Sequence, residues 1–135
     1  MSPVAAEDPE AQSLAPRARV VAHKFGGTSV ADAERYRHVA ALLLARDDEV
    51  QVTVVSAMKG VTDALIELAE MAAQNRAEWK DRWHDLRARH RGAAVSLLGE
   101  HAGPVVEWLD ERFDRLADIL GALAVIGELP REVLD

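Results

Sequence analysis

A lysine, two glycines and two hydroxyl residues stand together near the start of the chain, where an apolar run gives way to a helical pattern. Their order is Lys24-Phe25-Gly26-Gly27-Thr28-Ser29-Val30. Glycine lets a backbone approach a charged ligand closely, and the N–H groups of a helix N-terminus attract anions. Lysine adds a positive charge on a long side chain. These residues therefore predict a phosphate-binding loop between a strand and a helix.

This loop differs from the common nucleotide-binding loops. The chain contains neither Gly-x-x-x-x-Gly-Lys-[Ser/Thr] nor Gly-x-Gly-x-x-Gly. Its lysine precedes the glycines instead of following them. Taken without further comparison, the same residues are also compatible with a tight turn that binds no ligand and with a solvated lysine at a strand edge.

Two strands and two helices are expected to position the loop. Hydrophobic patterns predict strands over residues 19–25, read as buried, and 50–56, and helices over residues 33–46 and about 62–75. Strands separated by a helix favour a parallel pair with a right-handed crossover, which is an α/β arrangement. The residues expected to face inward are Tyr36, Val39, Ala40, Leu43 and Leu44 in the first helix, and Leu65, Ile66, Leu68 and Ala69 in the second. Thr62 or Asp63 is expected to cap the second helix.

The second part of the chain predicts a helical hairpin. Residues 76–98 read as one long helix, residues 99–104 as a turn, and residues 105–126 as a second long helix. Their inward stripes are Trp79, Trp83, Leu86 and His90 in one helix, and Leu109, Phe113, Leu116, Leu120 and Leu123 in the other. Such a seam favours antiparallel packing within the chain. A surface that binds a partner is the alternative.

Composition limits the function classes. The 135 residues include 16 basic and 23 acidic side chains, a formal charge of −7, which argues against general nucleic-acid binding. There is no cysteine, so disulfides and thiolate metal sites are excluded. No apolar run is long enough to span a membrane. Residues 1–18 read as a flexible extension without a secretory signal, and we expect a cytoplasmic protein.

The histidines and arginines of the second part of the chain predict no further functional site. His84, His90 and His101 do not share a helix face, so they predict no metal site, and no metal ligand is assigned. Arg87, Arg89 and Arg91 spread round the predicted helix and are expected to form a solvated, charge-mixed surface.

Two strings together resemble a known family. The loop of residues 24–30 resembles the opening signature of aspartate kinases, and Val54-Val55-Ser56-Ala57-Met58-Lys59-Gly60-Val61-Thr62-Asp63 is similar to that family's second block. The spacing between the strings and the long helical excursion after them are similar too. The resemblance runs from about residue 19 to the C-terminus.

The resemblance implies a partial amino-acid-kinase fold, a parallel sheet between helical layers with a long antiparallel helical hairpin, over residues 19–135. Within it, residues 19–75 would form strand, helix, strand and helix, and residues 76–126 the hairpin. It implies ATP and Mg²⁺ as cofactors and L-aspartate as the substrate, phosphorylated on its side chain to 4-phospho-aspartate for lysine, threonine, methionine and diaminopimelate synthesis. The implied phosphate-binding residues are Lys24, which is also catalytic, Phe25, Gly26 and Gly27. The implied substrate-binding residues are Thr28, Ser29, Ser56 and Thr62. Without the resemblance, plain turn and cap chemistry would be preferred for Ser56 and Thr62.

The chain stops before the rest of such a site. Glu128 stands in Gly-Glu-Leu-Pro-Arg-Glu, which resembles a segment just ahead of the family's acidic block, so no catalytic role is assigned to it. We expect an N-terminal piece with little or no activity alone. A parent fused to a homoserine dehydrogenase or to a diaminopimelate decarboxylase, and a homo-oligomer held by regulatory domains, are compatible with this expectation. Another amino-acid kinase and a non-catalytic assembly module are the alternatives.

Overall fold

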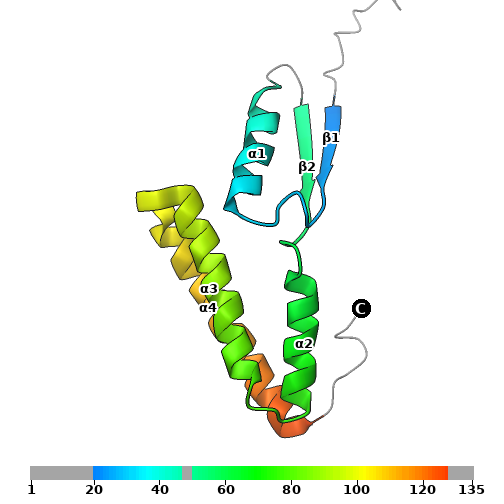
Figure 1. Cartoon of the computed structure of the whole chain (residues 1–135), viewed down its shortest axis with the longest axis vertical. Helices are drawn as coiled ribbons and strands as arrows, with labels where there is room; N and C mark the ends of the chain where they lie inside the picture. Colours follow the sequence, from blue (N-terminus) through cyan, green and yellow to red (C-terminus); the bar gives the residue numbers. More distant parts are fainter. Residues whose placement is uncertain (1–19, 47–49, 128–135) are drawn as a thin grey trace, which may run out of the picture.

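The computed structural model describes residues 20–46 and 50–127. Figure 1 shows the strands and the first helix at one end, and the other long helices at the opposite end. The elements are β1 (Val20–Phe25), α1 (Ala33–Leu44), β2 (Val50–Val55), α2 (Val61–Ala73), α3 (Trp79–Leu98), a 3₁₀ helix (Gly99–Ala102) and α4 (Gly103–Ile126). The α/β class with a helical hairpin is thus confirmed. The predicted extension of residues 1–18, and Glu128, lie outside the described residues.

The two strands pair in parallel, as predicted. Their register runs from Val20 beside Val50 to Phe25 beside Val55. The Ser56 N–H then donates a hydrogen bond to the Phe25 carbonyl oxygen over 2.9 Å, so the pairing continues for one residue beyond β2. Because both strands end together, the loops that follow them leave the sheet side by side.

One face of this sheet is open in the part of the chain that the structure describes. Side chains alternate between the faces of a strand, and the Gln51 side chain, on the covered face, donates to the Leu43 carbonyl oxygen of α1 over 2.9 Å. The exposed positions of the opposite face are Val20, Ala22, Lys24, Val50, Val52 and Val54. The prediction that the first strand is buried is therefore wrong, since its residues are alternately exposed and half-buried and α1 covers only one face.

Helix α1 begins at a side-chain cap. Asp32 has an extended backbone, and its carboxylate accepts a hydrogen bond from the Arg35 N–H over 2.9 Å, as an N-cap residue does. Val39 is buried, but Leu44 is 76% exposed. The predictions that Ala40 and Leu44 face inward are wrong, since both are exposed and Leu44 is the last residue of the helix.

Helix α2 begins one residue earlier than predicted. Its N-cap is Gly60, in the left-handed region with φ +78°, a conformation that glycine adopts without steric cost. Thr62 and Asp63 consequently lie within the first turn, and the prediction that either caps the helix is wrong. The buried stripe is Val61, Leu68, Met71 and Ala72. Leu65 is 39% exposed, because it stands at the margin of this stripe.

The helical end of the molecule holds the main core. Residues of α2, α3 and α4 meet in one apolar cluster whose buried members are Met58, Val61, Leu68, Met71, Ala72, Trp79, Trp83, Leu86, Phe113 and Leu120. Helices α3 and α4 run antiparallel, since Trp83 near the start of α3 contacts Phe113 while Arg91, further along α3, reaches the earlier Asp110. The predicted hairpin is confirmed, and the apolar residues between its two helices pack inside the molecule.

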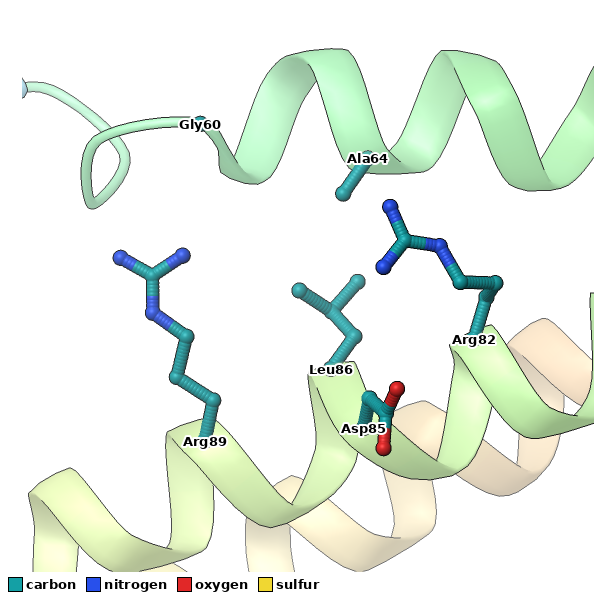
Figure 2. Close-up of a pocket in the computed structure, with 6 residues that line it drawn as sticks. All are labelled: Gly60, Ala64, Arg82, Asp85, Leu86 and Arg89. Atoms are coloured by element: carbon teal, nitrogen blue, oxygen red, sulfur yellow. The ribbon is translucent and has the colours of Figure 1, made fainter.

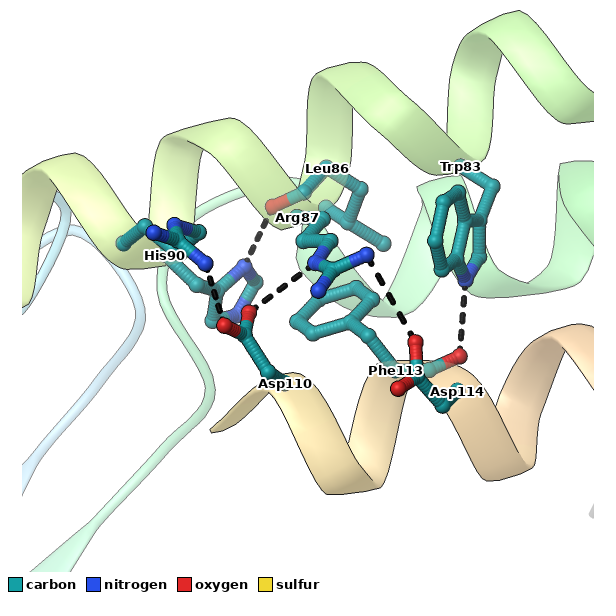
Figure 3. A network of polar contacts seen from close by, with 8 residues as sticks. Trp83, Leu86, Arg87, His90, Asp110, Phe113 and Asp114 are labelled. Carbon is teal, nitrogen blue, oxygen red and sulfur yellow. Dashed lines mark hydrogen bonds and ion pairs between the residues drawn. The ribbon is translucent and has the colours of Figure 1, made fainter. Parts of the chain in front are cut away.

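An ion-pair network reinforces the hairpin (Figure 3). Arg87 donates to Asp110 over 2.9 Å and lies 3.5 Å from Asp114, and Arg91 also pairs with Asp110. The hydrogen bonds from Arg87 and then Arg91 lower the pKa of Asp110 below its ordinary value. The Arg87 side chain is only 25% exposed. The prediction of a solvated surface is therefore wrong for Arg87, because α4 presents two carboxylates to it.

His90 belongs to the same contact layer. Its Nδ1 lies 2.7 Å from the Leu86 carbonyl oxygen, and its ring meets Phe113 edge-on at 5.2 Å between centroids. These contacts give His90 a packing role.

None of the helices within residues 20–46 and 50–127 is both long and apolar enough to cross a membrane.

Candidate functional site

The loops after β1 and β2 touch each other at Gly27. A Cβ atom placed on Gly27 would lie 3.1 Å from the Ala57 carbonyl oxygen and 3.5 Å from the Lys59 Cα. Each loop also has its own closing hydrogen bond: the Ser29 N–H donates to the Gly26 carbonyl over 2.9 Å, and the Val61 N–H to the Met58 carbonyl over 3.0 Å. The two segments singled out in the sequence therefore meet backbone to backbone.

The neighbouring glycine has different surroundings. A Cβ atom on Gly26 would meet no atom within 4 Å. The close approach of the second loop thus leaves little room for a side chain at Gly27, whereas Gly26 leaves open space in front of the backbone. Such space is what an incoming anion needs.

We expect Gly27→Val to lower the free energy of unfolding of this chain by about 1–3 kcal/mol, because the added side chain overpacks the contact with the second loop. Gly26→Val is the matched control, and its effect should stay within about 0.5 kcal/mol. Urea unfolding followed by circular dichroism measures both. Equal effects at the two glycines would contradict the proposed contact between the loops.

The predicted site residues gather at one end of the sheet, except for Thr62. Lys24 is exposed on the open face of β1, beside Val54 in the register. Phe25 is half-buried at the end of β1, Thr28 and Ser29 are exposed in the first loop, and Ser56 is the exposed residue that follows β2. Thr62 lies further along, exposed in the first turn of α2.

The helix N-terminus next to the site is not the one that the sequence suggested. The N-terminus of α1 already holds the Asp32 carboxylate, which occupies a backbone N–H and repels anions. No side chain caps the N-terminus of α2, whose first turn contains Asp63. The Val61 N–H already donates to the Met58 carbonyl, so the N–H groups that follow it are the ones at the positive end of the helix dipole. Sequence reasoning missed this terminus because Thr62 and Asp63 looked like caps.

A cavity of about 200 Å³ separates the start of α2 from α3 (Figure 2). Its lining residues are Gly60, Ala64, Arg82, Asp85, Leu86 and Arg89. Arg82 pairs with Glu67 over 2.6 Å. Arg89 donates from one guanidinium nitrogen to two carbonyl oxygens, that of Ala31 over 3.1 Å and that of Lys59 over 2.9 Å.

Arg89 was expected on a solvated surface, and it is exposed. The sequence did not predict that both loops of the site turn a carbonyl towards it. One sequence signal was available. Arg82 and Arg89 are seven residues apart, which places them two turns apart on the same face of a helix. Nothing in the sequence, however, marks the carbonyl groups that Arg89 reaches.

The acceptor groups of the described residues offer no ready metal site. Within residues 20–46 and 50–127, no three side chains of histidine, cysteine, aspartate or glutamate gather closely enough to hold a metal ion. We therefore assign none of these described residues to Mg²⁺. Magnesium commonly binds through substrate phosphates with one or two carboxylates.

The two parallel strands end together, and the glycine-containing loops that follow them touch each other. A lysine lies at the end of the first strand. These features define an α/β protein with a candidate phosphate site at the carboxyl ends of its strands. Residues 19–126 match the Amino acid kinase family. The chain belongs to this family.

Similar proteins within the family are aspartokinases. The chain is 32% identical over 114 residues to the chloroplastic bifunctional aspartokinase/homoserine dehydrogenase 1 of Arabidopsis thaliana, a match that covers 84% of this chain and 12% of that enzyme. It is 49% identical over 53 residues to the aspartokinase of Mycobacterium bovis, covering 38% of this chain and 13% of that enzyme. The chain thus spans about an eighth of the length of these relatives.

Proposed function

We propose that this chain supplies one half of the active site of an aspartate kinase, an enzyme that transfers the terminal phosphoryl group of ATP to the side-chain carboxylate of L-aspartate. Membership of the amino acid kinase family and similarity to aspartokinases support a kinase of this type. The observation that carries the proposal is the contact at Gly27, where the predicted phosphate loop meets the predicted substrate loop.

Each proposed role follows from the chemistry of phosphoryl transfer, which depends mainly on positioning and on stabilising negative charge. Lys24 would neutralise charge that develops on the transferred group. Gly26 and Gly27 would admit phosphate oxygens close to the main chain. Mg²⁺ would arrive with ATP and shield the charge of its phosphates, held in part by groups outside the described residues.

The hydroxyl groups would serve the second substrate. Thr28, Ser29 and Ser56 are exposed around the end of the sheet, where open α/β sheets bind their ligands. Thr62 lies in the first turn of α2, at a helix terminus that no side chain caps. The positive end of the helix dipole favours a carboxylate there, and the neighbouring Asp63 opposes it. A carboxylate of aspartate would therefore find hydroxyl donors and a favourable dipole on the second loop.

We expect the complete enzyme that carries these residues to consume ATP with L-aspartate, and this chain alone to show little or no turnover. The physical reason is that the described residues provide charge for the phosphate but no carboxylate cluster for the metal. A coupled assay of ATP consumption, with hydroxylamine to trap the acyl phosphate, measures the reaction.

L-Glutamate and N-acetyl-L-glutamate serve as competing substrates in the same assay. Preference for either over L-aspartate would replace the proposal with another kinase of the family. Robust turnover by the 135-residue chain would contradict the proposed half-site.

The alternative of an assembly module receives less support. Phe113 and Leu120, the centre of the predicted seam on α4, are 7% and 2% exposed. They pack against α2 and α3 within the same chain. The residues that suggested a partner surface are therefore occupied inside the molecule.

A further inference from the structure

We propose that Arg89 is a positioning residue that fastens the loop after β1 to the loop after β2, and so holds the two halves of the candidate site in register. The inference rests on the proposed function for its catalytic consequence. The fastening itself is a property of the fold and can be tested separately.

The geometry singles out Arg89 among the arginines of α3. Its guanidinium nitrogen lies 3.1 Å from the Ala31 carbonyl oxygen and 2.9 Å from the Lys59 carbonyl oxygen. Both distances are typical of N–H···O hydrogen bonds. One side chain from the helical end of the molecule therefore connects the two loops that carry the predicted phosphate- and substrate-binding residues.

Both accepting carbonyls stand at places where a small shift would move the site. Ala31 directly precedes Asp32, the N-cap of α1, and Lys59 directly precedes Gly60, the N-cap of α2. The neighbouring side chains are fixed in apolar surroundings, since Val30 is 0% and Met58 8% exposed. Arg89 thus restrains the outer end of each loop, while the contact at Gly27 restrains their middle.

Arginine suits this task better than lysine. Its planar guanidinium presents several N–H groups in fixed directions at the end of a long side chain. A hydrogen bond from a charged donor is stronger than one between neutral groups. The backbone of Arg89 is itself held, because α3 is fixed in the core by Trp83 and Leu86.

The same helix face provides a matched control. Arg82 lines the same cavity from two turns away, yet its partner is Glu67 and not a loop carbonyl (Figure 2). Arg82→Ala and Arg89→Ala remove the same charge and the same atoms from the same helix. Alanine favours the helix, so both variants should fold.

The first experiment measures amide hydrogen exchange in this chain. Arg89→Ala should speed exchange in residues 26–31 and 57–60 and leave α4 unchanged, because only the two loops lose a restraint. Arg82→Ala should leave exchange in both loops as in the wild type. Unchanged loop exchange in Arg89→Ala would overturn the proposal whatever the enzyme does.

The second experiment measures catalysis in the complete enzyme. Arg89→Ala should lower kcat/KM by about 10²-fold, the effect of misplacing reacting groups by roughly 1 Å. Added guanidinium ion should restore part of this loss, whereas Arg82→Ala should retain wild-type values. A loss without rescue by guanidinium would assign Arg89 a purely structural role and overturn the positioning role.

These two readouts separate the inference from the proposed function. If the complete wild-type enzyme does not phosphorylate L-aspartate, the proposed function fails, and the exchange measurement still decides whether Arg89 fastens the loops. If the enzyme is an aspartate kinase and the loops of Arg89→Ala exchange as in the wild type, the inference alone fails.

Discussion

Lys24→Ala should lower the turnover of the complete enzyme by roughly two to three orders of magnitude, the scale expected for removing one group that stabilises charge in a transition state. Lys24 is exposed at the end of β1, directly before the half-buried Phe25 and the open space at Gly26. Its ammonium group is therefore free to meet a ligand that approaches this end of the sheet. Steady-state kinetics with ATP and L-aspartate measure the effect.

A second lysine controls for the loss of charge. Lys80 lies on α3, over the ring of Trp79 at 5.9 Å, and Lys80→Ala should leave turnover unchanged. Thermal unfolding of Lys24→Ala should match the wild type, since the side chain makes no core contact. Near-normal turnover in Lys24→Ala would remove this lysine from the reaction.

Trp83→Ala should lower the free energy of unfolding of this chain by about 3–5 kcal/mol, the cost of deleting a large core side chain. Trp83 is 7% exposed, its indole N–H donates to the Phe113 carbonyl oxygen over 2.9 Å, and Arg87 lies over its ring at 5.1 Å. The loss is a large fraction of the roughly 5–15 kcal/mol by which native proteins are stable. Urea unfolding monitored by circular dichroism measures it.

Trp108 is the matched control for that substitution. It lies on α4 and is 53% exposed, with Arg112 over its ring at 4.7 Å. Trp108→Ala should cost only about 0.5–1 kcal/mol, the value of an exposed cation–π contact. Comparable losses for the two tryptophans would contradict the assignment of Trp83 to the core between α3 and α4.

Much of the fold could be predicted because its signals are local. The β-branched run of residues 50–56 and the glycines after residue 25 marked both strand ends, and a helix between two strands implied parallel pairing. The stripe from Trp79 to His90 predicted the buried face of α3. These patterns depend on side chains close in sequence, so they can be recognised without knowledge of the tertiary structure.

The errors arose where backbone groups or distant segments decide the outcome. Gly60 caps α2 through its left-handed backbone, and Thr62 looked like a better cap by side-chain chemistry. Leu44 and Leu65 lie at the margins of their helices' buried stripes, which neighbouring elements define. The role of Arg89 depends on main-chain carbonyls 58 and 30 residues away. The direction of a main-chain carbonyl cannot be predicted from the type of residue that carries it.

The candidate site itself was predicted as two separate strings, and their meeting was not. Sequence spacing placed the glycines after one strand and Ser56 after the next. The structure adds the contact at Gly27 and the uncapped start of α2. Both depend on how closely the loops approach, which no single string encodes.

The open face of the sheet affects the order in which parts of this molecule unfold. Helices α2, α3 and α4 enclose a core of their own, whereas β1 and β2 present a row of half-exposed valines, with Val52 49% and Val54 53% exposed. A two-stranded ribbon has little independent stability. Under rising denaturant the strands should therefore separate first, in a partial opening that leaves the helical end intact. The end of the molecule that carries the candidate phosphate site is then the part that unfolds most easily.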